Sequence, residues 1–139
     1  MSKNDKNSSI GHEVEISVTD LFANIPGHIY AKDQDGVYLA SNDRDEFSCP
    51  SDGTKKGSEI IGKTDKDFPW KDVAEVLQCN DKEVMLSGKT MVFIEQGKLK
   101  DGKLATVVSI KAPLRNKKGD IVGIIGNSIE LTGVKDQLK

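Results

Sequence analysis

Few side chains in this 139-residue sequence have the types and spacing that catalysis requires. The two histidines, His12 and His28, and the two cysteines, Cys49 and Cys79, lack the spacing of a zinc site. The sequence has no Gly-x-Ser-x-Gly elbow, no phosphate-binding Gly-rich loop with its Lys, and no His-Glu-x-x-His motif. We therefore predict that the protein is not an enzyme. The rival hypothesis is a small α+β enzyme that uses a pocket carboxylate such as Asp65 as its base.

Alternating side chains in the predicted strands give a stronger signal. Because successive side chains of a strand point to opposite faces, each strand divides into two sets. One set is mixed in polarity: Tyr30, Lys32, Val107, Ser109, Lys111, Ile124, Gly126 and Ser128. The other set is mostly apolar: Ile29, Ala31, Val108, Ile110, Ala112, Ile125, Asn127 and Ile129. Hydrophobicity alone favours burying the apolar set under the helices and leaving the mixed set in water.

A long helix is predicted over residues 71–87. Gly88 suits a left-handed cap at the end of this helix. The apolar residues that recur at helical spacing are Val73, Val76, Leu77 and Val84. Asn80 lies on the same stripe, four residues before Val84. A buried amide must find a partner, either in the protein or in a ligand. Pairing with neighbouring backbone is the simpler of the two alternatives.

The remaining elements are short strands separated by turn residues. Residues 28–32 and 37–41 flank the turn Asp33-Gln-Asp-Gly36 and are predicted to form a hairpin. Three more strands are predicted after the long helix, over residues 90–96, 104–113 and 121–131. A short helix over residues 17–25 can be capped by Ser17 or by Thr19 and Asp20. This order predicts an α+β fold, with one five-stranded antiparallel sheet and helices packed on one face.

Composition narrows the partners that we expect. The chain has 20 basic and 22 acidic residues and a pI near 5.7, so we expect no nucleic-acid partner. No apolar run is long enough to cross a bilayer, and residues 1–9 are polar, unlike a signal peptide. We expect a cytoplasmic location, one domain, and a flexible tail over residues 1–16.

Several motifs in this order resemble the PAS domains found upstream of bacterial sensor histidine kinases. The similarity spans residues 17–132. It rests on the first hairpin and on Ile60-Ile-Gly-Lys-Thr-Asp65, Asn80-Asp-Lys-Glu-Val84, Ser87-Gly-Lys89, Lys111-Ala-Pro-Leu-Arg115 and Gly123-Ile-Ile-Gly126. The chain departs from the family at Glu130-Leu-Thr132, where PAS domains usually carry Asp-x-Thr.

The resemblance implies a sheet in which the last strand lies beside the first and the mixed set faces the helices. That register would place six candidate ligand-binding residues around one pocket: Tyr30, Lys32, Asn80, Ser109, Lys111 and Ser128. We expect a small polar, anionic metabolite there. A buried Lys also needs a carboxylate, from Asp65, from Asp67 or from an acidic ligand.

The resemblance further implies a sensory domain of a two-component or related signalling protein, rather than an enzyme. Glu130 and Thr132 would couple the domain to a linker helix that begins at residues 133–139 and leads to a histidine kinase or cyclic-dinucleotide enzyme. No cofactor is expected, because the long helix has no His for haem and neither Cys lies in the flavin motif Asn-Cys-Arg-Phe. We also expect a homodimer formed by the N-terminal helix and the sheet surface. The alternative is a ligand-free PAS dimerisation module.

Overall fold

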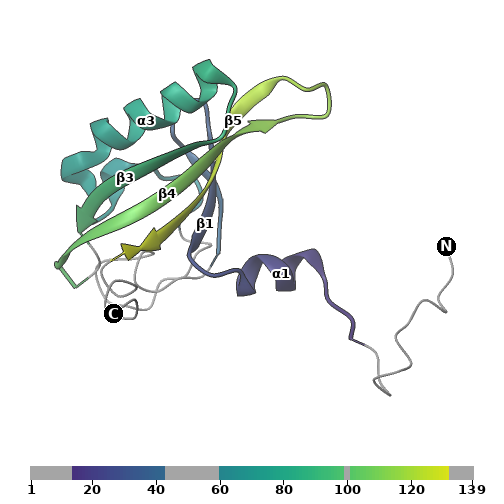
Figure 1. Cartoon of the computed structure of the whole chain (residues 1–139), viewed down its shortest axis with the longest axis horizontal. Helices are drawn as coiled ribbons and strands as arrows, with labels where there is room; N and C mark the ends of the chain where they lie inside the picture. The colour runs from purple at the N-terminus through teal and green to yellow at the C-terminus, as the bar shows by residue number, and fades with distance from the viewer. Residues whose placement is uncertain (1–13, 43–59, 99–100, 132–139) are drawn as a thin grey trace, which may run out of the picture.

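The computed structural model describes residues 14–42, 60–98 and 101–131. It contains a five-stranded antiparallel sheet in the order β2-β1-β5-β4-β3 (Figure 1). The strands are β1 (His28–Asp33), β2 (Tyr38–Ser41), β3 (Met91–Lys98), β4 (Leu104–Arg115) and β5 (Ile121–Glu130). The predicted fold class is confirmed, and so is the pairing of the last strand with the first.

The hairpin between β1 and β2 is closed by a side chain. Asp33 Oδ1 accepts hydrogen bonds from the backbone N–H groups of Asp35 and Val37, at 2.8 and 2.9 Å. Gly36 has a φ of 84°, a left-handed conformation that other residues rarely adopt. The Asp-Gly turn therefore forms as the sequence predicts.

Three short helices and one longer helix complete the described part of the chain. They are α1 (Val18–Asn24), η4 (Asp65–Asp67), η5 (Lys71–Val73) and α3 (Ala74–Ser87). Ser17 caps α1 in a reciprocal capping box with Asp20, and Gly88 ends α3 at a φ of 68°. The predicted helix over residues 71–87 is thus a 3₁₀ turn followed by an α-helix, because α3 starts only at Ala74.

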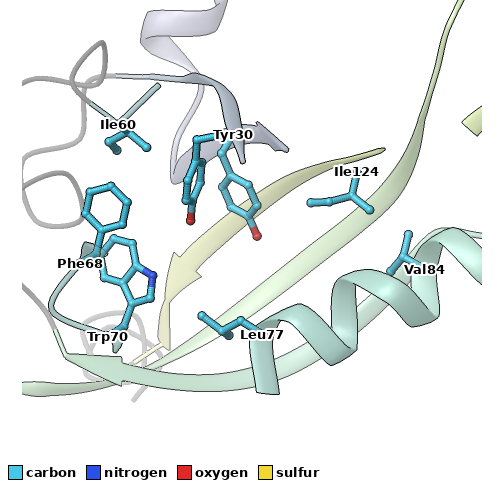
Figure 2. Packing of buried hydrophobic residues seen from close by; sticks show 8 residues of the cluster. Tyr30, Ile60, Phe68, Trp70, Leu77, Val84 and Ile124 are labelled. Atoms are coloured by element: carbon cyan, nitrogen blue, oxygen red, sulfur yellow. The ribbon is translucent and has the colours of Figure 1, made fainter. Parts of the chain in front are cut away.

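Helix α3 lies across one face of the sheet, and the buried core fills the space on that side (Figures 1 and 2). The core combines aromatic and aliphatic side chains: Tyr30, Tyr38, Ile60, Phe68, Trp70, Leu77, Val84 and Ile124. The rings of Phe68 and Trp70 stack with centroids 5.0 Å apart, and Tyr38 meets Phe68 edge-on. The mixed set of strand residues therefore faces the helix, contrary to what hydrophobicity alone favours.

The opposite face of the sheet is apolar and open in this single copy. Its exposed side chains include Val92, Ile94, Ile110, Ile125 and Ile129. Helix α1 does not cover them: none of its residues is buried, and it projects away from the sheet (Figure 1). Helix α1 therefore does not act as a cover over the core.

Candidate functional site

A buried ionic cluster joins the inner face of the sheet to η4 and α3. Lys32 of β1 donates to Asp65 Oδ2 at 2.7 Å and to Asp81 Oδ2 at 2.8 Å. Lys111 of β4 donates to Asp81 Oδ1 at 2.8 Å and to Glu95 Oε2 at 2.7 Å. Asp81 therefore bridges the two lysines. All five side chains are at most 5% exposed, so the cluster lies outside bulk water.

Strand alternation explains why two lysines enter the core. Lys32 and Lys111 occupy inward-facing positions on β1 and β4, and β5 lies between these strands. Isolated buried ammonium groups would be strongly unfavourable, whereas here each has two carboxylate partners. The Lys32 ammonium also lies 5.0 Å from the centroid of the Tyr38 ring.

Asp65 is held by two further side chains of the core. Its Oδ1 accepts hydrogen bonds from Tyr38 OH at 2.6 Å and from Trp70 Nε1 at 2.9 Å. Thr64 caps the 3₁₀ turn η4 in a capping box with Asp67, which points Asp67 to solvent and leaves Asp65 buried. The carboxylate that the buried lysine needs is therefore supplied by Asp65, and not by Asp67.

These contacts set the protonation states of the cluster. Burial lowers the pKa of Lys32, but Tyr38, Asp65 and Asp81 outweigh this effect and hold that pKa above its ordinary value. The pKa of Lys111 is raised by Tyr30, Asp81 and Glu95 against the same effect of burial. At neutral pH both ammonium groups are therefore charged.

The acidic and phenolic groups respond in the complementary way. Burial would raise the pKa of Asp65, but Lys32 and the hydrogen bonds from Tyr38 and Trp70 hold it below its ordinary value. Burial raises the pKa of Tyr30 and of Tyr38. Both phenols are therefore neutral and able to donate hydrogen bonds at neutral pH.

A second polar chain runs along the inner face of the sheet. The Tyr30 and Ser128 hydroxyls lie 3.1 Å apart, and the Ser109 and Ser128 hydroxyls lie 2.7 Å apart. Gly126 allows this arrangement, because a Cβ at that position would lie 2.5 Å from the Tyr30 ring. The two serines are opposite each other in the pairing of β4 with β5, so their matching alternation brings them together.

A cavity of about 60 Å³ lies beside the cluster. Its walls combine charged groups, hydroxyls and rings, contributed by the inner face of the sheet and by the helical segments: His28, Tyr30, Lys32, Tyr38, Asp65, Trp70, Leu77, Glu95, Gln96, Gly97, Lys98, Ala105, Val107, Lys111 and Ser128. Because one water needs about 10–15 Å³ of such volume, the cavity has room for roughly four to six water-sized groups.

Four of the six predicted ligand-binding residues line this cavity. They are Tyr30, Lys32, Lys111 and Ser128. Ser109 is buried behind Ser128, and Asn80 is half-buried and donates to Glu95 Oε2 at 2.9 Å. Their role in ligand binding stays a prediction. Of the predicted coupling residues, Glu130 ends β5, and Thr132 lies outside the described residues, as do residues 133–139.

Sequence reasoning missed two carboxylates of the cluster. Asp81 is buried on the same stripe of α3 as Leu77 and Val84, at spacings of four and three, whereas Val76, predicted for that stripe, is 57% exposed. Glu95 alternates with Met91 and Phe93 on the inner face of β3. Both residues could have been found as acids at buried positions that alternation and helical spacing define.

Within residues 14–42, 60–98 and 101–131, no group of three or more His, Cys, Asp or Glu side chains could hold a metal ion. The helices of those same ranges are all too short or too polar to span a membrane.

Comparison with known proteins identifies the family. The chain matches the family model described as PAS fold over residues 22–136. It therefore belongs to the PAS fold family, and the resemblance inferred from its motifs is confirmed. A search of curated proteins finds no match.

Solved structures include close neighbours of two kinds. A dimer of VqmA from Vibrio cholerae, a LuxR-type receptor studied in the absence of its target DNA, is 26% identical with a TM-score of 0.74 over 86% of this chain and 53% of that one. VqmA bound to DPO is 25% identical with a TM-score of 0.69, over 79% and 55%. The PAS domain of a Colwellia psychrerythraea protein is 15% identical with a TM-score of 0.62, over 81% and 92%, and supports the fold alone.

These matches overturn one expectation. The exclusion of nucleic acid as a partner is wrong, because the similar receptor VqmA binds DNA. The exclusion rested on the nearly balanced charge of this chain. However, the chain spans only about half the length of the VqmA chains it matches, and the charge of one domain does not report on the rest of such a receptor.

Proposed function

We propose that the chain is a sensory PAS domain that binds a small polar molecule in the cavity beneath α3. The observation that carries this proposal is the cavity, where charged and hydroxyl groups of the sheet meet aromatic rings around a partly open space. Apolar walls with a few convergent polar groups are typical of small-molecule sites. In this proposal, binding is passed on to a separate effector unit of a longer protein.

The effector unit is the less direct part of the proposal. Similarity to VqmA, a LuxR-type receptor, favours a DNA-binding unit over the histidine kinase expected from the sequence. A ligand would then control DNA binding, and the protein would work in the cytoplasm. DPO, which VqmA binds, is one compound to test against this chain.

A ligand-free dimerisation module is the second candidate, and one observation favours it. The ionic cluster is paired internally, and among the described residues Asn127 Oδ1 is the one buried side-chain N or O atom without a hydrogen-bond partner. A cluster of this kind could serve only to fix α3 to the sheet.

The enzyme hypothesis is weaker, because three donors hold the pKa of Asp65 below its ordinary value and make it a poor base.

A thermal-shift screen separates ligand binding from a purely structural cavity. The compounds are DPO, organic acids, amino acids, amides, amines and nucleotides, because a ligand of the folded form raises Tm by mass action. Ala105→Leu fills the cavity from β4 and leaves every ionic side chain of the cluster in place in the sequence. Ala112→Leu adds the same volume on the outer face of the same strand and is the matched control.

We expect at least one compound to raise the Tm of the wild type and of Ala112→Leu, and to leave that of Ala105→Leu unchanged. At a hundredfold excess over Kd the gain is about 2.7 kcal/mol. If no compound shifts the wild type, or if Ala105→Leu responds equally, the dimerisation module becomes the better account.

A further inference from the structure

The buried cluster carries more acid than base. Two lysines, Lys32 and Lys111, face three carboxylates, those of Asp65, Asp81 and Glu95. Two positive charges and three negative charges give the cluster a net charge of one negative unit. Lys98, the other lysine on the cavity wall, is half-exposed and lies 3.7 Å from Asp72, so it adds little charge inside.

Glu95 carries the part of this charge that is open to a ligand. Its Oε2 accepts hydrogen bonds from Lys111 Nζ at 2.7 Å and from Asn80 Nδ2 at 2.9 Å. Across the described ranges no hydrogen bond reaches the other oxygen, Oε1. This oxygen is not among the fully buried atoms that lack a partner, and Glu95 lines the cavity, so Oε1 is accessible from the cavity. An acceptor with a formal charge, placed on a buried wall, favours a hydrogen-bond donor.

The other walls are compatible with the same class of ligand. Tyr30, Tyr38 and Trp70 present aromatic surface, which attracts cations and packs against planar neutral groups. Each ammonium group has three donors, and two of them are used by carboxylates. The third donor can serve a neutral acceptor such as a carbonyl oxygen.

We propose that the cavity selects a small uncharged or cationic molecule that donates an N–H to Glu95 Oε1, and that it excludes anions. This inference rests on the proposed function and specifies the ligand for the same cavity. It argues against the anionic metabolite expected from the sequence, because that expectation considered the lysines without Asp81 and Glu95. An anion would meet ammonium groups already neutralised, and it would lie beside an unpaired carboxylate oxygen.

Three compounds of one shape test the charge directly. Acetamidinium, acetamide and acetate are planar and nearly identical in size, and all are small enough for the cavity. Each is titrated into the ¹⁵N-labelled protein at neutral pH and constant ionic strength, and amide chemical shifts are followed. We expect saturable shifts at Glu95, Val107 and Lys111 with acetamidinium and acetamide, and none at these positions with acetate.

A charge variant tests the role of Glu95. Glu95→Gln keeps the shape of the side chain and removes its charge, so acetamidinium should bind at least about tenfold more weakly. Glu83→Gln removes a charge from an exposed position on α3 and should bind like the wild type. The wild-type titrations with the three compounds remain decisive even if Glu95→Gln unfolds.

The outcomes separate this inference from the function on which it rests. If acetate shifts Glu95, Val107 and Lys111 as strongly as acetamidinium, the charge selection is wrong, although the cavity remains a ligand site. The selection also fails if none of the three compounds binds while the thermal-shift screen yields a ligand blocked by Ala105→Leu. If neither experiment yields a ligand for the cavity, both proposals are overturned.

Discussion

Lys32 shows how a charged residue can hold a core together. The ammonium group is 2% exposed and joins β1 to η4 and α3 through Asp65 and Asp81. Replacing both partners of such a pair can be nearly neutral, but removing one leaves an uncompensated buried charge. The consequences should therefore depend on whether one partner or both are removed.

Lys32→Met should lower the free energy of unfolding by roughly 3–5 kcal/mol, because Asp65 and Asp81 would lose a buried cation. Urea denaturation followed by circular dichroism measures this change. Lys66→Met, at an exposed position of η4, is the control and should change stability by less than about 0.5 kcal/mol. A loss of stability no larger than that of the control would mean that the cluster is not held as described.

Asp65 should make the stability of the fold fall at acid pH. Its pKa in the folded protein lies below the ordinary value of 3.8, so the unfolded state binds the proton first as pH falls. Stability is therefore fully present above about pH 4 and is lost as pH falls through the folded-state pKa.

Unfolding free energies from about pH 5 to about pH 2 test this dependence. The wild type should lose stability more steeply over this range than Asp65→Asn, which has no titrating group at that position. Asp120→Asn, in the exposed turn before β5, should follow the wild-type curve. Parallel curves for the wild type and Asp65→Asn would count against the lowered pKa.

Among the elements, β5 allows the close approach of its neighbours because it carries glycines. The ideal Cβ position of Gly126 lies 2.5 to 2.7 Å from atoms of the Tyr30 side chain. This side chain is buried and its hydroxyl lies 3.1 Å from that of Ser128, so the ring has little room to move. Gly126→Ala should therefore displace Tyr30 and destabilise the fold by about 1–3 kcal/mol. Thermal unfolding and the loss of the Tyr30 ring signals in NMR spectra would measure both effects.

Val92→Ala, on the exposed face of β3, serves as the control and should be much milder. If Gly126→Ala folds with unchanged stability and Tyr30 in place, the close packing of this ring is not needed.

The elements were largely predictable from the sequence because they depend on local patterns. Turn residues such as Asp33 and Gly36 and the cap at Ser17 act within a few residues of the chain. Hydrophobicity could not predict which face of the sheet packs against the helices, since two lysines stabilised by distant carboxylates occupy the core. Asp65, Asp81 and Glu95 meet those lysines across 16 to 49 residues of sequence, and only the fold brings them together.

In the molecule as a whole, the outer face of the sheet is an exposed apolar surface. Its exposed side chains include Ile94 at 64% and Val92 at 63%, and α1 adds Val18 at 82%. Apolar patches of this kind mark interaction surfaces. We therefore expect this face and α1 to form the homodimer predicted from the sequence.

Sedimentation equilibrium should show a concentration-dependent dimer for the wild type. Ile94→Lys should shift the protein to monomer, because it introduces an ammonium group into the apolar face. Val76→Lys, at a similarly exposed position on α3, should dimerise normally. Monomeric wild type at high concentration would remove this prediction.

The proposed function requires the cavity beneath α3 to be a ligand site. A crystal structure of the protein with the strongest compound from the thermal-shift screen tests this most directly. We expect electron density for the compound against Glu95, Lys111 and Trp70. A compound found only on the outer face of the sheet, with the cavity holding water or collapsed, would contradict it.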